Sequence, residues 1–326
     1  MTTTLLTLLL SSVLVAAAFW GPWLLRRAAP TLAIIPRIAA VALTVTALLW
    51  IAALVALGPV VAWMSSGPAW LPQQAAEVCG RCLSAASPFG ESALSLGIPA
   101  VVPLALPVVG VVAVLAGLAR EFVLLRKSQA AFGSELRAGS DRISVLGSQA
   151  RITPDIGLQA FSLPHEHGGI VLSRGTLSTL SPGELVAVLA HEQAHLDQRH
   201  HLIMAILNGT TRYFRWIPLV RAVRESVPHY LEIAADQAAK QAAGTTALAG
   251  ALLKLGQPEV PASAAGVPAH AMLHAAGSER IRHLVGVPRP AASAALAAAV
   301  GAYAFMLAAV IAAVNLPYVV AVVSGC

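Results

Sequence analysis

The chain is organised around residues 189–198, which read LAHEQAHLDQ. A capping box precedes this stretch, with Ser181 at the N-cap position and Glu184 at the third helical position. We therefore predict that the stretch lies in an α-helix. Residues four apart in a helix share one face, so His191 and His195 can bind the same Zn²⁺ ion.

Glu192 follows the first histidine directly. In H-E-x-x-H metallopeptidases this glutamate takes a proton from a metal-bound water. The alternative is a pair of ordinary surface histidines on an amphipathic helix. The flanking residues argue against it, because an unpaired His-Glu-His group among apolar side chains would cost several kcal/mol. These flanking residues are Leu185, Val186, Val188, Leu189 and Ala190.

The composition is that of an integral membrane protein. Of 326 residues, 57% are hydrophobic and 11% are charged, and the mean hydropathy is +0.74, which is too apolar for a soluble domain. The net charge is +6, but the basic residues flank the apolar stretches, as topology determinants do. We therefore predict no direct binding of nucleic acid. The flanking basic residues are Arg26, Arg27, Arg37, Arg120, Arg126, Lys127 and Arg289.

Four apolar stretches are long enough to cross a lipid bilayer: residues 4–25, 38–64, 98–119 and 293–320. A secretory signal carries positive charge before its apolar region, and none precedes the first stretch. We therefore predict a retained helix with its N-terminus outside, a cleaved signal peptide being the alternative.

The four spans divide the chain into three parts. Residues 1–127 hold three transmembrane helices, with an extracytoplasmic loop at residues 65–97. Residues 128–288 alone have the composition of a soluble domain, and the basic residues before them predict a cytoplasmic location. Residues 289–326 supply the fourth transmembrane helix and a short extracytoplasmic tail. The prediction is a multi-pass protein of a bacterial-type plasma membrane with both termini outside.

Two cysteines, Cys79 and Cys82, lie in the predicted extracytoplasmic loop. In an oxidising compartment this spacing allows a small disulfide that fixes the loop. A redox or signal-sensing role is the alternative. One C-x-x-C pair does not supply the four ligands of a structural zinc site.

The polar middle contains three short segments typical of β-strands, at residues 143–146, 158–163 and 168–173. We expect a small sheet against the zinc helix, with an exposed edge that can bind an extended peptide by strand addition. The segment His165–His167 reads His-Glu-His, but two imidazoles on a turn favour a solvated loop over a metal clip. The expected fold is an α-helical integral membrane protein with four spans and a cytoplasmic α+β zincin-like metallopeptidase domain.

A catalytic zinc site has three protein ligands and one open position, so a third ligand must come from elsewhere in the chain. The best candidate is Glu232, which shares a helix face with Asp236 in an otherwise apolar segment. One carboxylate can bind zinc while the other accepts a hydrogen bond from a ligating histidine. A solvent-facing acidic pair is the alternative.

Two histidines are rivals for the third ligand. His201 stands where metzincins place theirs, but those proteins need glycine where this chain has Gln198. His229 is the weaker rival. We expect Arg199 and His200 to form a polar helix end outside the site.

The combination of these motifs resembles the BlaR/MecR-type antirepressor metallopeptidases. Three spans, an H-E-x-x-H domain, an E-x-x-x-D helix and a final span follow in that order, with the specific motifs within residues 158–240. The resemblance implies a cytoplasmic protein substrate, with a transcriptional repressor as the candidate. It also implies the roles of the site residues: His191, His195 and Glu232 as zinc ligands, Glu192 as general base and Asp236 as the carboxylate that supports a ligand.

Two features differ from that family. The penicillin-binding sensor domain of the antibiotic-sensing members is not found, so we do not expect direct β-lactam sensing. The aromatic-Asn-Pro pattern before the acidic helix becomes Trp216-Ile217-Pro218, without the asparagine. HtpX-type membrane peptidases share the zinc motifs, but resemblance to them implies spans between the two motifs. Arg212 and Arg215 make residues 202–220 a poor span.

The function predicted from the sequence is that of a membrane-bound zinc endopeptidase with Zn²⁺ as cofactor, a peptide or protein as substrate and the lipid bilayer as surroundings. One alternative is an HtpX-like quality-control peptidase with broad cleavage. The other is a non-catalytic, zinc-stabilised membrane receptor. Glu192 and an open three-ligand site argue against the receptor, because structural zinc sites are more often closed by four ligands. The sequence carries no signal for an oligomeric state.

Overall fold

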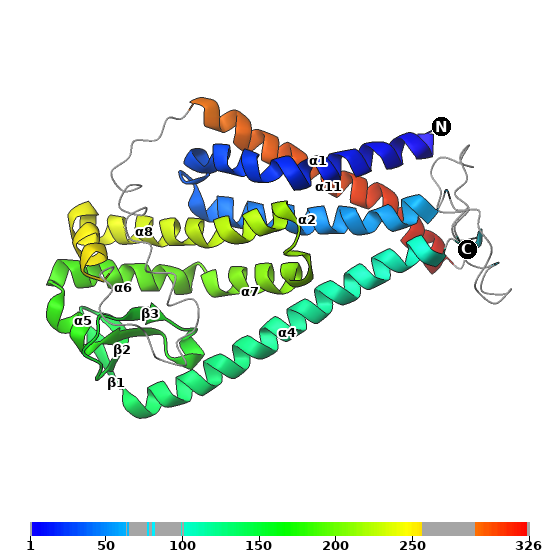
Figure 1. Cartoon of the computed structure of the whole chain (residues 1–326). Coiled ribbons are helices and arrows are strands. Elements are labelled where there is room, and N and C mark those ends of the chain that lie inside the picture. The colour runs from blue at the N-terminus through cyan, green and yellow to red at the C-terminus, as the bar shows by residue number, and fades with distance from the viewer. Residues whose placement is uncertain are drawn as a thin grey trace.

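The computed structural model describes residues 2–62, 64, 77, 80, 81, 99, 101–255 and 291–324. Within these ranges four long helices each contain an apolar stretch long enough to cross a membrane. The helices are α1 (Thr2–Leu32), α2 (Pro36–Ala62), α4 (Val101–Gly139) and α11 (Ala291–Val323). In Figure 1, α1, α2 and α11 lie close together, whereas α4 starts beside α2 and then diverges toward the sheet. Apolar helices of sufficient length thus lie where the four spans were predicted, which supports a multi-pass membrane protein.

The helix α2 is central to this bundle, because it contacts α1, α4 and α11. Small residues let the neighbouring helices approach, and Ala40, Ala53 and Ala56 are fully buried. The indole Nε1 of Trp50 donates a hydrogen bond to the Leu14 carbonyl at 3.2 Å, which joins α2 to α1. This contact satisfies a polar group that neither lipid nor apolar side chains could satisfy.

The helix α4 is longer than the predicted span. It continues without a break to Gly139, so the first residues of the predicted soluble domain belong to the helix that leaves the membrane. The sequence changes from apolar to polar near Arg120, but residues 120–132 contain no proline or glycine to end a helix there.

A four-stranded mixed sheet follows α4, with strand order β1-β2-β4-β3. The strands are β1 (Asp141–Val145), β2 (Ser148–Thr153), β3 (Ala160–Ser162) and β4 (Ile170–Ser173). Leu146 and Gly147, with φ of 49° and 88°, form the two-residue turn between the antiparallel strands β1 and β2. β2 runs parallel to β4, and the edge strand β3 runs antiparallel to it. Among the strands only β2 was not predicted, although β1, β3 and β4 differ from their predicted bounds.

The helix α6 (Pro182–Asp197) packs one face on this sheet. Its capping box forms as predicted, since the Ser181 backbone N–H donates to Glu184 Oε2 at 2.7 Å and the Glu184 N–H donates to Ser181 Oγ at 3.5 Å. Leu189 of α6 and the β4 residues Ile170 and Leu172 belong to one buried cluster. Burial of each such side chain contributes roughly 1.5–3 kcal/mol.

The opposite face of α6 contacts α8 (Pro218–Leu255), which lies between α6 and α2 (Figure 1). The helical path is interrupted at Gly244, where φ is +82°. The segment after this break packs against Ala187 of α6 through Leu248 and Leu252. Lys254 then pairs with Glu184 at 2.6 Å, so the end of α8 contacts the start of α6.

Between α6 and α8 lie α7 (His200–Thr211) and the short helix η2 (Arg212–Phe214). α7 is too short to span a bilayer. None of the four candidate spans falls between the H-E-x-x-H motif and Glu232. The other short elements are α5 (Arg174–Thr179) and η1 (His165–His167). The predicted disulfide of Cys79 and Cys82 lies outside the described residues.

Candidate metal centre

Two helices bring three predicted ligands together. His191 and His195 of α6 have their Nε2 atoms 3.1 Å apart. Glu232 of α8 places Oε2 3.5 Å from His191 Nε2 and Oε1 3.5 Å from His195 Nε2. In the described part of the chain this is the one set of three or more His, Cys, Asp or Glu side chains that could hold a metal ion.

The close packing of α6 on α8 allows this meeting. Ala187 of α6 and Ala239 of α8 are fully buried in the contact between the two helices, and small side chains let helix backbones approach closely. Glu232 is 9% exposed and His191 6% exposed. A glutamate and histidines at such depth need a partner of opposite charge or a metal ion.

Asp236 contacts the first candidate ligand, His191. Its Oδ1 lies 3.1 Å from His191 Nδ1, and its side chain is buried one helical turn beyond Glu232. Because a carboxylate only accepts, His191 carries its proton on Nδ1 and directs the lone pair of Nε2 toward Glu232. The predicted pair of carboxylates therefore places one oxygen near each nitrogen of the His191 ring.

His200 contacts the second candidate ligand, His195. Its Nδ1 lies 2.8 Å from His195 Nδ1, and its Nε2 lies 3.3 Å from Gln198 Oε1. The amide oxygen accepts from Nε2, so Nδ1 of a neutral His200 is an acceptor for the His195 N–H. The lone pair of His195 Nε2 then faces Glu232. Burial is the main cause that lowers the pKa of His200 to about 3, so that this ring is neutral near pH 7.

The expectation of a polar helix end holds for Arg199, which is exposed between α6 and α7, but it is wrong for His200. His200 is only 3% exposed and contacts a ligand side chain. The chain turns at Arg199, which adopts the left-handed conformation with φ 53° and ψ 41°, although it is not a glycine. Metzincins need a turn-forming glycine at the position of Gln198, whereas this chain turns one residue later. A histidine five residues after the second ligand was the signal that could have identified His200.

The remaining sequence candidates lie outside the group. His201 and His229 are half-buried, and neither belongs to the metal-ligand set of the described residues. In η1, His165 and Glu166 are exposed and no residue is buried, as a solvated loop requires. The structure thus brings together Glu232 and the H-E-x-x-H histidines rather than the rival ligands.

The candidate ligand atoms lie close enough together to bind one ion. One such atom from each of the three residues lies within 4.8 Å of the others. The two histidine Nε2 atoms are 3.1 Å apart, and each lies 3.5 Å from a different carboxylate oxygen of Glu232. Two imidazoles and one carboxylate are a typical ligand set for catalytic zinc. Glu192, 3% exposed, has an Oε2 atom that receives no hydrogen bond in the described structure. A buried acceptor of this kind fits a site that admits a water molecule beside the metal.

Comparison with known proteins agrees with this chemistry. Residues 147–230 match the model of peptidase family M48, a stretch that includes β2, the other strands after it and the H-E-x-x-H helix, and ends two residues before Glu232. No curated protein and no solved structure matches the chain. The family match and the four apolar helices support a membrane metallopeptidase.

Proposed function

We propose that this protein is a membrane-bound zinc endopeptidase, with His191, His195 and Glu232 as zinc ligands. The observation that carries the proposal is the convergence of one ligand atom from each of these residues within 4.8 Å of the others, in a ligand set of two imidazoles and one carboxylate that is typical of catalytic zinc. The family match supports peptidase chemistry independently of this geometry.

Zinc at this position would acidify a water molecule and polarise a peptide carbonyl. Residues of the chain would transfer the protons and orient the two histidine rings. Glu192 accepts the proton of the attacking water on its carboxylate and returns that proton to the leaving amine. Asp236 and His200 hold the rings of His191 and His195 in the tautomers that direct Nε2 toward the ion.

For the substrate we propose a protein segment on the membrane face that carries the domain, which by the charge pattern is the cytoplasmic face. The resemblance to BlaR/MecR-type antirepressors makes a transcriptional repressor the first candidate. An HtpX-like quality-control peptidase would cut many membrane proteins instead. The number of substrates cleaved distinguishes these two readings.

The decisive experiment compares wild type with Glu192→Gln. Both purified full-length chains are expected to bind one Zn²⁺ each, because residue 192 is not a ligand. The variant should lose cleavage of fluorescein-labelled casein by roughly 10²–10⁴-fold, the usual contribution of a general base. Glu166→Gln, an exposed change in η1, is the matched control and should cleave normally.

Two results would contradict the proposal: a wild-type chain that binds no zinc, or a Glu192→Gln variant that cuts as fast as wild type. Mapping new N-termini in membranes and cytosol that contain either form then identifies the substrates. A single cleaved repressor supports the signalling role, whereas many cleaved membrane proteins support quality control.

A further inference from the structure

The second half of α7, η2 and the start of α8 form a hairpin between the two metal-binding helices. Its tip is residues 212–217. At this tip Tyr213 is 48% exposed and Trp216 is 77% exposed, and the Trp216 indole donates to the Tyr213 carbonyl at 3.1 Å. The tip therefore presents two amphipathic aromatic side chains in a fixed arrangement.

An arginine holds the hairpin closed. Arg224 of α8 donates to Thr211 Oγ1 at 2.7 Å and to the Asn208 carbonyl at 3.4 Å. Burial lowers the pKa of this guanidinium. The contacts satisfy the end of α7, so the tip is a built feature of the domain and not a frayed loop.

The tip lies beside the segments of α1 and α4 that come just before their first basic residues, Arg26 and Arg120. A Cβ atom on Gly209 of α7 would be 2.9 Å from Leu118 Cα of α4, and one on Gly21 of α1 would be 2.6 Å from Leu219 Cδ1 of α8. Gly21 and Leu118 both lie inside candidate membrane spans, Thr7–Leu32 and Val101–Ser134. The hairpin therefore reaches the level at which α1 and α4 are still apolar.

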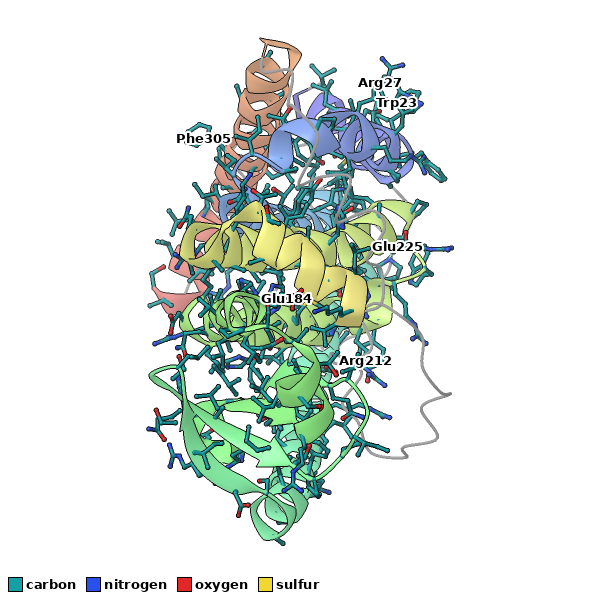
Figure 2. The ribbon with its side chains drawn as sticks, turned by 90° about the vertical axis from the view of Figure 1, so that its left-hand side faces the viewer. Trp23, Arg27, Glu184, Arg212, Glu225 and Phe305 are labelled. Carbon is teal, nitrogen blue, oxygen red and sulfur yellow. The ribbon has the colours of Figure 1, made fainter. Side chains whose placement is uncertain are left out.

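The same level of α1 has the composition of a membrane interface. Trp20 is 69% and Trp23 49% exposed, and the Arg27 guanidinium carbon lies 4.7 Å from the Trp23 ring centroid. In the view along the long helices, Trp23, Arg27 and Arg212 of the tip lie toward the same side of the molecule (Figure 2). Tryptophan and tyrosine gather where lipid headgroups meet acyl chains, with arginine reaching outward to phosphate.

We propose that the tip of the α7–α8 hairpin is inserted at the boundary between headgroups and acyl chains, where Tyr213 and Trp216 join Trp20 and Trp23 in one aromatic belt. The occupant of the exposed tip is phospholipid. Arg212 and Arg215 suit lipid phosphates, and the residues that flank the tip adjoin α1 and α4, two of the candidate membrane helices. A second copy of the chain would need no such match in level with α1.

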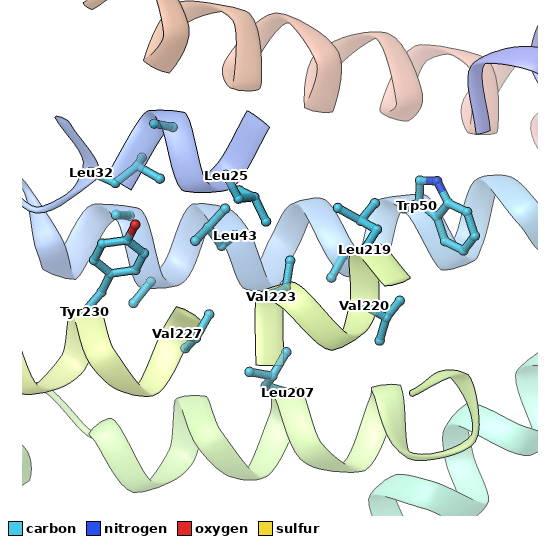
Figure 3. Packing of buried hydrophobic residues seen from close by; sticks show 14 of the residues in the cluster. Leu25, Leu32, Leu43, Trp50, Leu207, Leu219, Val220, Val223, Val227 and Tyr230 are labelled. Carbon is cyan, nitrogen blue, oxygen red and sulfur yellow. The ribbon is translucent and has the colours of Figure 1, made fainter. Parts of the chain in front are cut away.

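This insertion fixes the height of the metal centre. Tyr230, two residues before Glu232, lies in the same buried cluster as Leu32 and at the same end of it (Figure 3). Leu32 is 11 residues beyond Gly21, about 16 Å along α1, whereas headgroups occupy roughly 5–7 Å of each face. The centre would then lie about 10 Å outside the headgroups. This step rests on the proposed peptidase function. A metal centre at this height favours cleavage of substrate segments that lie within roughly five extended residues of the acyl boundary.

The test places a fluorescent label at the tip of the full chain. Trp216→Cys is labelled with bimane and reconstituted in phosphatidylcholine–phosphatidylglycerol nanodiscs. Ile156→Cys is the matched control, because Ile156 is also a large apolar side chain, is 87% exposed and lies on the sheet side of the domain. The background replaces the native cysteines by serine: Cys79, Cys82 and Cys326.

The label at position 216 should be quenched by doxyl-lipid several-fold more than the label at 156, with the opposite order for aqueous iodide. Equal iodide quenching of the labels at positions 216 and 156 would overturn the proposal. Quenching of the position 216 label by a second copy of the chain, without quenching by doxyl-lipid, would also overturn it. If the Trp216 variant fails to fold, Tyr213→Cys provides the same measurement. Because the readout needs neither zinc nor cleavage, its outcome is independent of the peptidase assignment.

Discussion

Removal of the His200 side chain should weaken zinc binding although His200 is not a ligand. The His195 Nδ1–H group donates across 2.8 Å to His200, which is 3% exposed. In His200→Ala this donor is left without its partner in a buried site, at a cost of about 1–3 kcal/mol. Since 1.4 kcal/mol corresponds to a factor of ten, we expect zinc affinity to fall roughly 10–100-fold, the usual range for groups that orient metal ligands.

The assay is competition for Zn²⁺ between the purified full-length chain and a chromophoric chelator, with the unfolding of the apo form measured in parallel. His200→Asn places an amide oxygen close to the position of Nδ1 and should restore most of the affinity. Asp236→Ala should cause a similar loss through His191. His201→Ala is the matched neighbour and should bind zinc normally.

A His200→Ala variant that binds zinc as tightly as wild type would refute the role of His200 in orienting His195. That role is equally refuted if His201→Ala loses zinc, because that result would restore the rival third ligand. A loss of apo stability that His200→Asn does not repair, with unchanged zinc affinity, would show that His200 acts only in packing.

Two further predictions concern stability in detergent. Gly209→Ala should lower the midpoint of thermal unfolding, because the added methyl group overpacks against Leu118 at a cost of about 1–3 kcal/mol. The control Gly301→Ala should leave the midpoint unchanged, because the new Cβ meets open space. Equal midpoints for the two variants would contradict the close contact of α7 with α4. Lys254→Met should cost about 1 kcal/mol at pH 7, because a half-exposed ion pair is partly screened. Lys254 holds the pKa of Glu184 below its usual 4.5. Denaturation should therefore show a stability difference from wild type that persists above pH 4.5 and disappears as the pH falls through the lowered pKa. A difference that is unchanged at about pH 2 would contradict the pairing.

The parts of this fold that could be predicted are those that short-range sequence patterns specify. Apolar stretches of bilayer length identified the four membrane helices, and the Ser181–Glu184 capping box identified the start of α6. The strand β2 was missed because only Ala150 and Ile152 of its residues are buried. Its alternation is so brief that the segment resembles a polar loop.

The site was predictable only as far as helix periodicity reaches. Spacing alone placed His191 and His195 on one face, but the left-handed turn at Arg199 has no marker such as glycine, and so the contact of His200 was missed. The pairing of Glu232 with the histidines depends on how α8 packs on α6. The chemistry of the residues suggested that pairing, yet local sequence does not specify the approach of the two helices.

The helix α8 connects a candidate membrane span with the candidate metal centre. Its first turn adjoins Gly21 within a membrane span, and fourteen residues after Pro218 the same helix carries Glu232. A change in bilayer thickness that tilts α1 and α8 would alter the alignment of Glu232 with the histidines. By thermodynamic reciprocity, zinc occupancy would shift the preferred tilt by the same free energy. Lipid composition is thereby expected to act as an effector of metal affinity.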